Sequence, residues 1–211
     1  MLGDLTRRID RRRGACALIA IKERARCKTR LAEALAPSAR IEVVRSMLAA
    51  VLSAAGAAQT VRQIIVVSPE RDSVPAQIPV LADTGECLNG ALRQAHRVLL
   101  ELGCREVAIL PADLPKITAA EIDDLVHAGR AGGFAIAPDT AGVGTNALYL
   151  ASLLPFRFQF GADSQRLHLQ EAQRAGLSAA VVHLPGLAFD VDSPADLDRL
   201  DGQQWLARLQ A

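Results

Sequence analysis

Residues 106–115, EVAILPADLP, carry the pattern that decides the fold. Glu106–Leu110 is a short, mostly apolar run, typical of a strand that is buried on both faces of a sheet. The run passes directly into a turn in which Asp113 stands between two prolines. In open α/β sheets, ligands bind beyond the carboxyl ends of the strands. The stretch therefore predicts a buried strand followed at once by an acidic position in the functional site.

Strand and helix patterns alternate on both sides of this stretch. Further strands are predicted at residues 15–21, 63–68, 78–81, 133–137, 145–150, 179–184 and 187–191. Helices are predicted at residues 37–55, 88–102, 118–127 and 164–175, and a last one begins at Pro194. There is no internal repeat and no linker-like segment. The alternation predicts one α/β domain with a mixed, mainly parallel sheet flanked by helices.

The composition excludes several classes of protein. Half of the 211 residues are hydrophobic and the net charge is +1, so the molecule has no overall field that favours nucleic acid or a membrane surface. No apolar run approaches the length of a membrane span, and the four cysteines form no CxxC pair, which is typical of reduced thiols in a cytoplasmic protein. Residues 1–13 contain five arginines and are predicted to be a disordered basic leader before a domain at 14–211. An RNA-contacting arm is the alternative.

Three acidic residues follow predicted strands. Asp113 comes after residues 106–110, and Asp190 and Asp192 flank Val191 at the end of the last predicted strand. Carboxylates spaced i and i+2 in an extended segment point to the same side. A hard divalent cation such as Mg²⁺ would relieve their repulsion and bind phosphates. The alternative is that Asp190 or Asp192 only caps the helix that begins at Pro194.

Residues 22–30 form a basic loop after the first predicted strand, with five cations in nine residues. Such a loop can bind a triphosphate through lysine point charges and arginine forks, and a solvated surface loop is the alternative. The chain contains neither a Walker loop nor a GxGxxG dinucleotide motif, which argues against both of those phosphate sites.

A third group of residues combines GVGTNAL at 142–148 with FGADS at 160–164. Gly161 allows a close backbone approach, Ser164 is predicted as a helix N-cap, and Thr145 offers a hydroxyl. A helix N-terminus is a natural anion site, although an ordinary capped helix would show the same pattern. His168 lies one helical turn after Ser164 and is predicted either to face this site or to cover the helix surface.

Together, these segments resemble the CofC/FbiD family of guanylyltransferases, which act in the biosynthesis of the deazaflavin coenzyme F-420. The similarity runs from Ala15 to Leu200 and is carried by IAIKERARCKTRLA, LNGAL, LPADLP, APDTAGVGTNAL, FGADSQRLH and FDVDSPADL. The ordered set GTNAL, FGxxSxxxH and DVDSPxDL is its most distinctive part. Ala20 stands where the family usually has a proline.

The resemblance implies a single-domain, Rossmann-like, GT-A-like nucleotidyltransferase fold that uses Mg²⁺. The implied reaction transfers GMP from GTP to a small phosphorylated hydroxy acid, which is 3-phospho-D-glycerate, phosphoenolpyruvate or 2-phospho-L-lactate. Pyrophosphate leaves, and the product can pass to a downstream deazaflavin transferase. The resemblance implies that Asp113, Asp190 and Asp192 bind the metal and are catalytic. The implied nucleotide-binding residues are Lys22, Lys28, Arg30, Asn89 and Gly90, of which Lys28 is also catalytic. The implied acceptor-binding residues are Thr145, Gly161, Ser164 and His168.

Two other hypotheses remain open from the sequence. One is a related sugar-phosphate nucleotidyltransferase or glycosyltransferase-like enzyme, and GTNAL with FGxxSxxxH argues against it. The other is a non-catalytic protein that binds a nucleotide or RNA, and the intact set of aspartates argues against that. A homodimer is the oligomer to test for, because two-fold dimers are the commonest assemblies.

Overall fold

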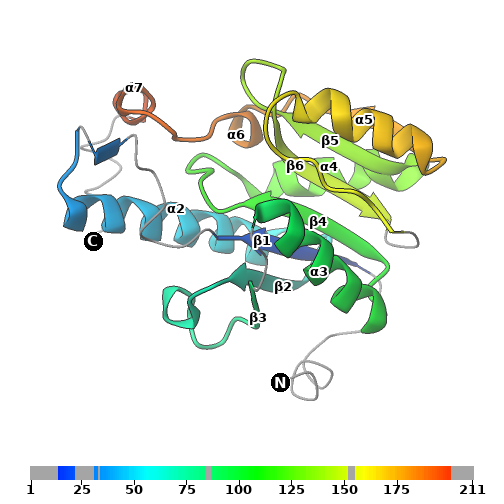
Figure 1. Cartoon of the computed structure of the whole chain (residues 1–211), viewed down its shortest axis with the longest axis horizontal. Coiled ribbons are helices and arrows are strands. Elements are labelled where there is room, and N and C mark those ends of the chain that lie inside the picture. The colour runs from blue at the N-terminus through cyan, green and yellow to red at the C-terminus, as the bar shows by residue number, and fades with distance from the viewer. Residues whose placement is uncertain (1–13, 22–30, 33, 84–86, 152–154, 201–211) are drawn as a thin grey trace.

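The computed structural model describes residues 14–21, 31–32, 34–83, 87–151 and 155–200. These residues form one seven-stranded sheet in the order β3-β2-β1-β4-β6-β5-β7 (Figure 1). β6 is antiparallel to both of its neighbours, and every other pair of adjacent strands is parallel. The strands are β1 (Ala15–Ala20), β2 (Val61–Ser68), β3 (Val80–Ala82), β4 (Glu106–Pro111), β5 (Gly133–Pro138), β6 (Thr145–Ala151) and β7 (Ser178–Val181). The predicted α/β fold class with a mixed, mainly parallel sheet is confirmed.

The order of the strands creates a switch point at the centre of the sheet. The chain leaves β1 toward β2 and β3 on one side, and it returns to β4 on the other side of β1. Ligands bind at such points, just outside the carboxyl ends of the strands. Because β6 runs antiparallel to β4, its first residues lie at the same edge as the last residues of β1 and β4.

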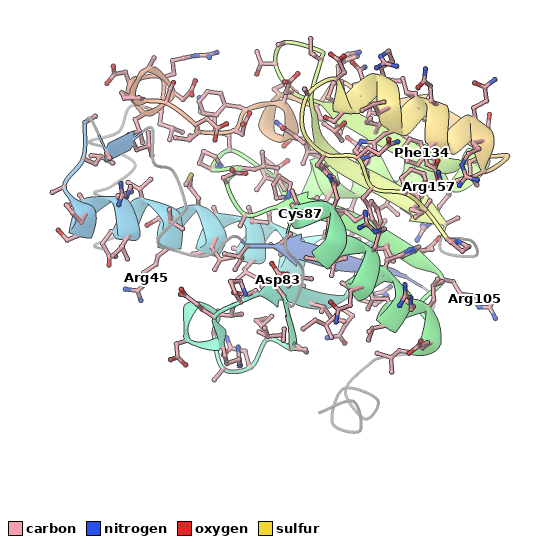
Figure 2. All side chains as sticks on the ribbon, in the orientation of Figure 1. Arg45, Asp83, Cys87, Arg105, Phe134 and Arg157 are labelled. Atoms are coloured by element: carbon pink, nitrogen blue, oxygen red, sulfur yellow. The ribbon has the colours of Figure 1, made fainter. Side chains whose placement is uncertain are left out.

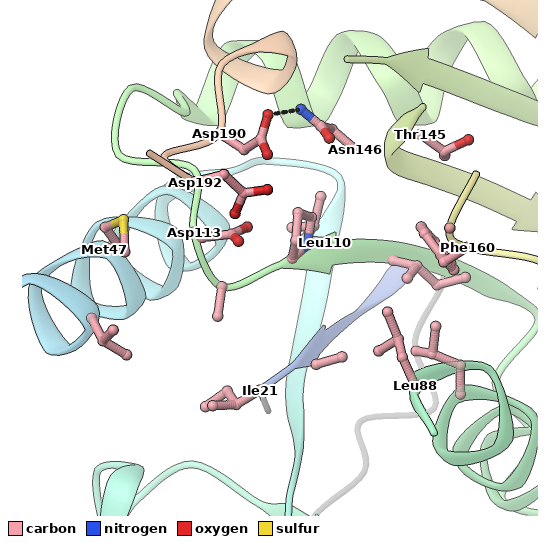
Figure 3. A pocket seen from close by; sticks show the side chains of 17 residues that line it. Ile21, Met47, Leu88, Leu110, Asp113, Thr145, Asn146, Phe160, Asp190 and Asp192 are labelled. Atoms are coloured by element: carbon pink, nitrogen blue, oxygen red, sulfur yellow. Dashed lines mark hydrogen bonds between the residues drawn. The ribbon is translucent and has the colours of Figure 1, made fainter. Parts of the chain in front are cut away.

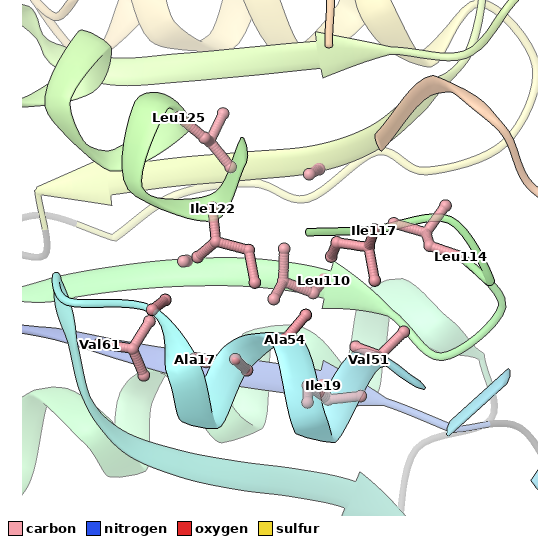
Figure 4. Packing of buried hydrophobic residues seen from close by; sticks show 14 of the residues in the cluster. Ala17, Ile19, Val51, Ala54, Val61, Leu110, Leu114, Ile117, Ile122 and Leu125 are labelled. Carbon is pink, nitrogen blue, oxygen red and sulfur yellow. The ribbon is translucent and has the colours of Figure 1, made fainter. Parts of the chain in front are cut away.

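Helices cover both faces of the sheet. α2 (Pro37–Ala57) and α4 (Ala119–Gly132) pack on one face, and α3 (Leu88–Glu101) and α5 (Ser164–Arg174) pack on the other. Val51 of α2 and Leu125 of α4 are fully buried in the first cluster (Figure 4). Each such side chain contributes about 1.5–3 kcal/mol on burial, so these faces fix the helices on the sheet.

Charged side chains lie on the outer surface, and large apolar side chains lie in the core. Figure 2 shows Arg45 and Arg105 projecting away from the ribbon, whereas Phe134 of β5 lies inside and is fully buried. No helix among the described residues is long and apolar enough to cross a bilayer. Cys16, Cys87 and Cys104 are free thiols, and Cys27 and residues 1–13 lie outside the described part of the chain.

One predicted strand is wrong. Residues 187–191 do not join the sheet: α6 (Pro185–Ala188) is a short helix, and the chain then continues without sheet partners to α7 (Pro194–Asp198). Leu187 and Val191 are both fully buried, but in different clusters. These two residues are therefore apolar because they anchor a connecting segment to the core. From the sequence alone, a short apolar run of this kind cannot be distinguished from a strand.

The structure shows capping boxes at the start of two helices and corrects the predicted N-cap of a third. Thr118 and Ser193 each form a capping box, with Glu121 and Asp196 respectively. The N-cap of α5 is Asp163, not Ser164, and its φ of 54° lies in the left-handed region that aspartate tolerates better than most residues. Ser193 also removes the alternative that Asp190 or Asp192 is the cap of the last helix.

Candidate active site

A cavity of about 330 Å³ opens at the switch point of the sheet. Its floor is formed by the ends of β1 and β4 and by the start of β6 (Figure 3). Asp113, Asp190 and Asp192 lie on one side of it and Thr145 lies on the other (Figure 3), and Gly161 is also part of the lining. The apolar lining consists of Ala20, Ile21, Val44, Met47, Leu88, Leu92, Ile109, Leu110, Pro111, Ala112 and Phe160. The structure therefore brings two of the three predicted groups of residues to one place.

The three aspartates come from two segments of the chain. Asp113 follows β4, and Asp190 and Asp192 lie between α6 and α7. Figure 3 shows the three carboxylates on one side of the cavity. Burial, followed by the charges of Asp113 and Asp192, raises the pKa of Asp190 above its ordinary value. The acidic side thus carries repulsion that a bound cation would relieve.

A small apolar cluster fixes the segment that carries Asp190 and Asp192. Phe189 and Val191 pack with Val43 and Met47 of α2. The Lys116 ammonium lies 4.3 Å from the centre of the Phe189 ring, close enough for a cation–π contact. Because Phe189 and Val191 point into this cluster, the alternating aspartates are left to face the cavity.

The donor set suits a hard, oxygen-preferring ion. Among the described residues, no group of three or more His, Cys, Asp and Glu side chains already forms a metal site. Mg²⁺ does not require one, because it keeps several waters and is usually held by one or two carboxylates together with substrate phosphates. The three carboxylates on one side of the cavity include enough ligands of this kind.

Asn146 belongs to the site although the sequence analysis did not select it. Its side-chain nitrogen donates to the Asp190 carboxylate across 3.3 Å and to the carbonyl oxygen of Ala188 across 3.0 Å. It therefore anchors the acidic segment to β6 (Figure 3). Its position directly after Thr145 in the GTNAL motif was the available signal.

The predicted acceptor residues divide into those that line the cavity and those behind it. Thr145 and Gly161 line it, whereas Ser164 and His168 are buried in α5 and do not. The Thr145 hydroxyl lies 3.0 Å from Nδ1 of His168. His168 therefore neither faces the cavity nor covers the helix surface. Burial lowers its pKa to about 4, so the ring is neutral near pH 7.

Asn89 has a different environment from the one that the nucleotide prediction suggests. Its amide accepts from the backbone N–H of Phe160 across 2.8 Å and donates to the carbonyl oxygen of the same residue across 3.0 Å. Both ends of the amide thus hold the segment that leads to Gly161. Gly90 lies in the first turn of α3 and is not among the lining residues. Lys22, Lys28 and Arg30 lie outside the described residues, so their predicted contacts stay predictions.

The fold first defines a structural class, α/β proteins with a mixed, mainly parallel sheet, and solved structures share it. A structure described as a nucleotide-diphospho-sugar transferase of Desulfovibrio desulfuricans G20 superposes with a TM-score of 0.73 at 18% identity, over 88% of this chain and 85% of that one. A CMP:2-keto-3-deoxy-manno-octonic acid synthetase complexed with CTP gives a TM-score of 0.60 at 14% identity, over 90% and 98% of the two chains. At these identities the likeness concerns the fold alone.

The sequence comparisons identify the family. The family model described as "Guanylyl transferase CofC like" matches residues 15–203. A phosphoenolpyruvate guanylyltransferase of Sphaerobacter thermophilus is 39% identical over 88% of this chain and 92% of its own length. A protein of the same name in Rubrobacter xylanophilus is 38% identical, with the same coverage. The chain belongs to the CofC-like guanylyltransferase family and is a nucleotidyltransferase.

Proposed function

We propose that this enzyme transfers GMP from GTP to a small phosphorylated hydroxy acid and releases pyrophosphate. The observation that carries the proposal is the cavity at the switch point, which is lined by Asp113, Asp190 and Asp192 together with Thr145 and Gly161. The acidic side suits a cation with its phosphates, and the lining also offers the hydroxyl of Thr145 and the exposed backbone of Gly161. A reaction between two phosphorylated substrates needs both features.

The reaction is an in-line displacement at phosphorus. A phosphate oxygen of the acceptor forms a bond to the α-phosphorus of GTP, and the bond from that phosphorus to the bridging oxygen of the β-phosphate breaks. Because the attacking oxygen is already anionic near neutral pH, no general base is required, and positioning with charge neutralisation supplies the catalysis. Asp113, Asp190 and Asp192 would hold Mg²⁺, which would supply charge stabilisation for the attacking and leaving oxygens.

Phosphoenolpyruvate is the acceptor that we propose first, because several relatives at 33–39% identity carry the name phosphoenolpyruvate guanylyltransferase. 3-Phospho-D-glycerate and 2-phospho-L-lactate are the competing acceptors. They differ from it by a hydroxyl group, a double bond or the position of the phosphate, and a few placed donors decide between such ligands. The product would be consumed by a deazaflavin transferase in coenzyme F-420 biosynthesis.

The test uses purified protein with GTP, Mg²⁺ and each of the three phospho-acids in turn. Pyrophosphate release is followed, products are identified by mass, and the downstream transferase with its deazaflavin substrate is added as a trap for labile products. Turnover with one acid supports the proposal and selects the acceptor. The proposal would be overturned by turnover with a sugar phosphate alone. It would also be overturned if folded protein that binds GTP showed no turnover with any of the three acids.

A further inference from the structure

We propose that His168 is a positioning residue that orients the Thr145 hydroxyl as a hydrogen-bond donor toward an anionic oxygen of the acceptor. The identity of that acceptor rests on the proposed function. The arrangement of the two side chains rests on the geometry of β6, α5 and the segment before α5. The residue that meets the ligand is Thr145, and His168 acts through it from the interior.

The hydrogen bonds of His168 determine which of its nitrogens carries the proton. The backbone N–H of Gln159 donates to Nε2 across 2.9 Å, so Nε2 must be an unprotonated acceptor. In a neutral imidazole, the other nitrogen then holds the hydrogen. Nδ1 of His168 lies 3.0 Å from the Thr145 hydroxyl oxygen and therefore donates to it.

This assignment also determines what the threonine can offer. A hydroxyl has one hydrogen to donate and two lone pairs to accept with. When Nδ1 of His168 donates to one lone pair, the hydrogen of Thr145 is left for a partner on the cavity side, where Thr145 forms part of the lining. A fixed donor forms its strongest hydrogen bond with an anionic oxygen, such as that of a phosphate or a carboxylate.

The pairing of β6 with β5 contains a bulge directly after Thr145. Pro138 of β5 pairs with Thr145 and Ala137 pairs with Ala147, so Asn146 is the extra residue between them. Bulges re-aim side chains and are frequent beside active sites. Here the two neighbouring side chains reach opposite sides of the site: Thr145 contacts His168, and Asn146 contacts Asp190.

The surroundings of His168 favour a single orientation of its ring. The segment before α5 is tied to that helix a second time, because Glu171 accepts from the backbone N–H of Arg157 across 3.1 Å. The ring of Phe160 packs edge-on against the imidazole, with 4.8 Å between centroids. His168 has no exposed surface. Its two nitrogens therefore keep their separate partners.

Two substitutions separate the two nitrogens. In His168→Asn the side-chain amide nitrogen can take the place of Nδ1 and donate to Thr145, whereas the bond to Gln159 is lost. In His168→Gln the amide can take the place of Nε2 and accept from Gln159, whereas the donor to Thr145 is lost. We expect His168→Gln to raise the KM for the acceptor about 5- to 10-fold, as the loss of one net hydrogen bond would. The KM for GTP should stay within about twofold, and His168→Asn should recover most of the acceptor affinity.

A double-mutant cycle with Thr145→Val tests whether the histidine acts through the threonine. In the valine background, His168→Gln should cause no further rise in the acceptor KM. An equal rise in both backgrounds, or an unchanged KM in His168→Gln alone, would overturn the proposal. Glu171→Gln is the matched control, because it loosens the same segment without contacting Thr145. It should lower the Tm and leave the acceptor KM within about twofold.

A measurement without turnover separates this inference from the proposed function. Nitrogen-15 NMR of histidine-labelled protein reports which ring nitrogen of His168 carries hydrogen, with His168→Gln used to assign the signal. A neutral ring protonated at Nδ1 supports the arrangement even in a protein that is silent with every phospho-acid. A ring protonated at Nε2 refutes it even in an active enzyme.

Discussion

The backbone N–H of Val191 donates to the carbonyl oxygen of Asp113 across 3.4 Å, and this hydrogen bond joins the two segments that carry the acidic residues. The residues are 78 positions apart in the chain, so the acidic wall exists only when β4 and the segment after α6 are both in place. Val191 is fully buried, so the bond is sheltered from water. The packing of Val191 thus fixes its neighbours Asp190 and Asp192 in position relative to Asp113.

Asp190→Asn is expected to reduce turnover by about a hundredfold or more, because it removes a ligand from the proposed magnesium site. The same change should raise the Tm of the magnesium-free protein. The rise is expected because burial and neighbouring charges raise the pKa of Asp190, so its ionised form costs stability at neutral pH. Initial rates and thermal melts with and without Mg²⁺ check both effects. Unchanged turnover in Asp190→Asn would refute the proposal that Asp190 binds the magnesium ion.

Asn146→Ala should weaken the response to Mg²⁺, because it frees the Asp190 carboxylate and the Ala188 carbonyl from β6. We expect about a tenfold fall in turnover at low Mg²⁺ that is partly restored at high Mg²⁺. Thr140→Val is a matched control, since the Thr140 hydroxyl donates to the same Ala188 carbonyl across 2.9 Å without contacting Asp190. Equal magnesium titrations for both variants would show that Asn146 does not position Asp190.

Asn89→Ala tests whether this residue contacts the nucleotide or supports the acceptor side. Because both ends of its amide bind the Phe160 backbone, the substitution should raise the acceptor KM about tenfold and leave the GTP KM within about twofold. Arg93→Ala, which alters an exposed side chain one turn further along α3, should change neither constant. A rise confined to the GTP KM would instead support the nucleotide contact that the family resemblance implies.

The sequence was sufficient for the fold class and for most of the acidic site, for a physical reason. Buried parallel strands leave continuous apolar runs, and the position directly after such a run identifies the functional edge of the sheet, which is why Asp113 could be selected. Local patterns fail where burial is set by distant partners. Leu187 and Val191 are apolar because they pack into two separate clusters, and nothing in their spacing shows that they are not in a strand.

The support behind the site was less accessible to sequence reasoning than the site itself. The role of Asn89 depends on Phe160, 71 positions further along the chain, and the partner of His168 is 23 positions before it. Such hydrogen-bonded pairs result from the packing of α3 and α5 on one face of the sheet, and no local sequence motif predicts them. The residues in FGADSQRLH could be chosen together, but their division into lining and supporting residues required the structure.

Acidification from pH 6.5 toward pH 5 should destabilise the protein because of two buried histidines. Burial lowers the pKa of His96 and of His168 to about 4, whereas both are near 6.5 in the unfolded chain. The unfolded state therefore binds more protons in this range, so stability is full above pH 6.5 and falls as the pH drops toward 4. By pH 5 the loss should be about 2 kcal/mol for each histidine.

Urea unfolding at pH 7.5, 6.0 and 5.0 measures this loss, in a range where carboxylates with lowered pKa values such as Glu106 remain ionised. His96→Gln replaces one of the two groups with a polar side chain that does not titrate. It should therefore reduce the difference in unfolding free energy between pH 7.5 and pH 5.0 by about half. Equal stability of the unsubstituted protein at these two pH values would mean that both imidazoles are protonated in the folded state at pH 5.0. For His168 that result would also conflict with the acceptor role of Nε2 toward Gln159.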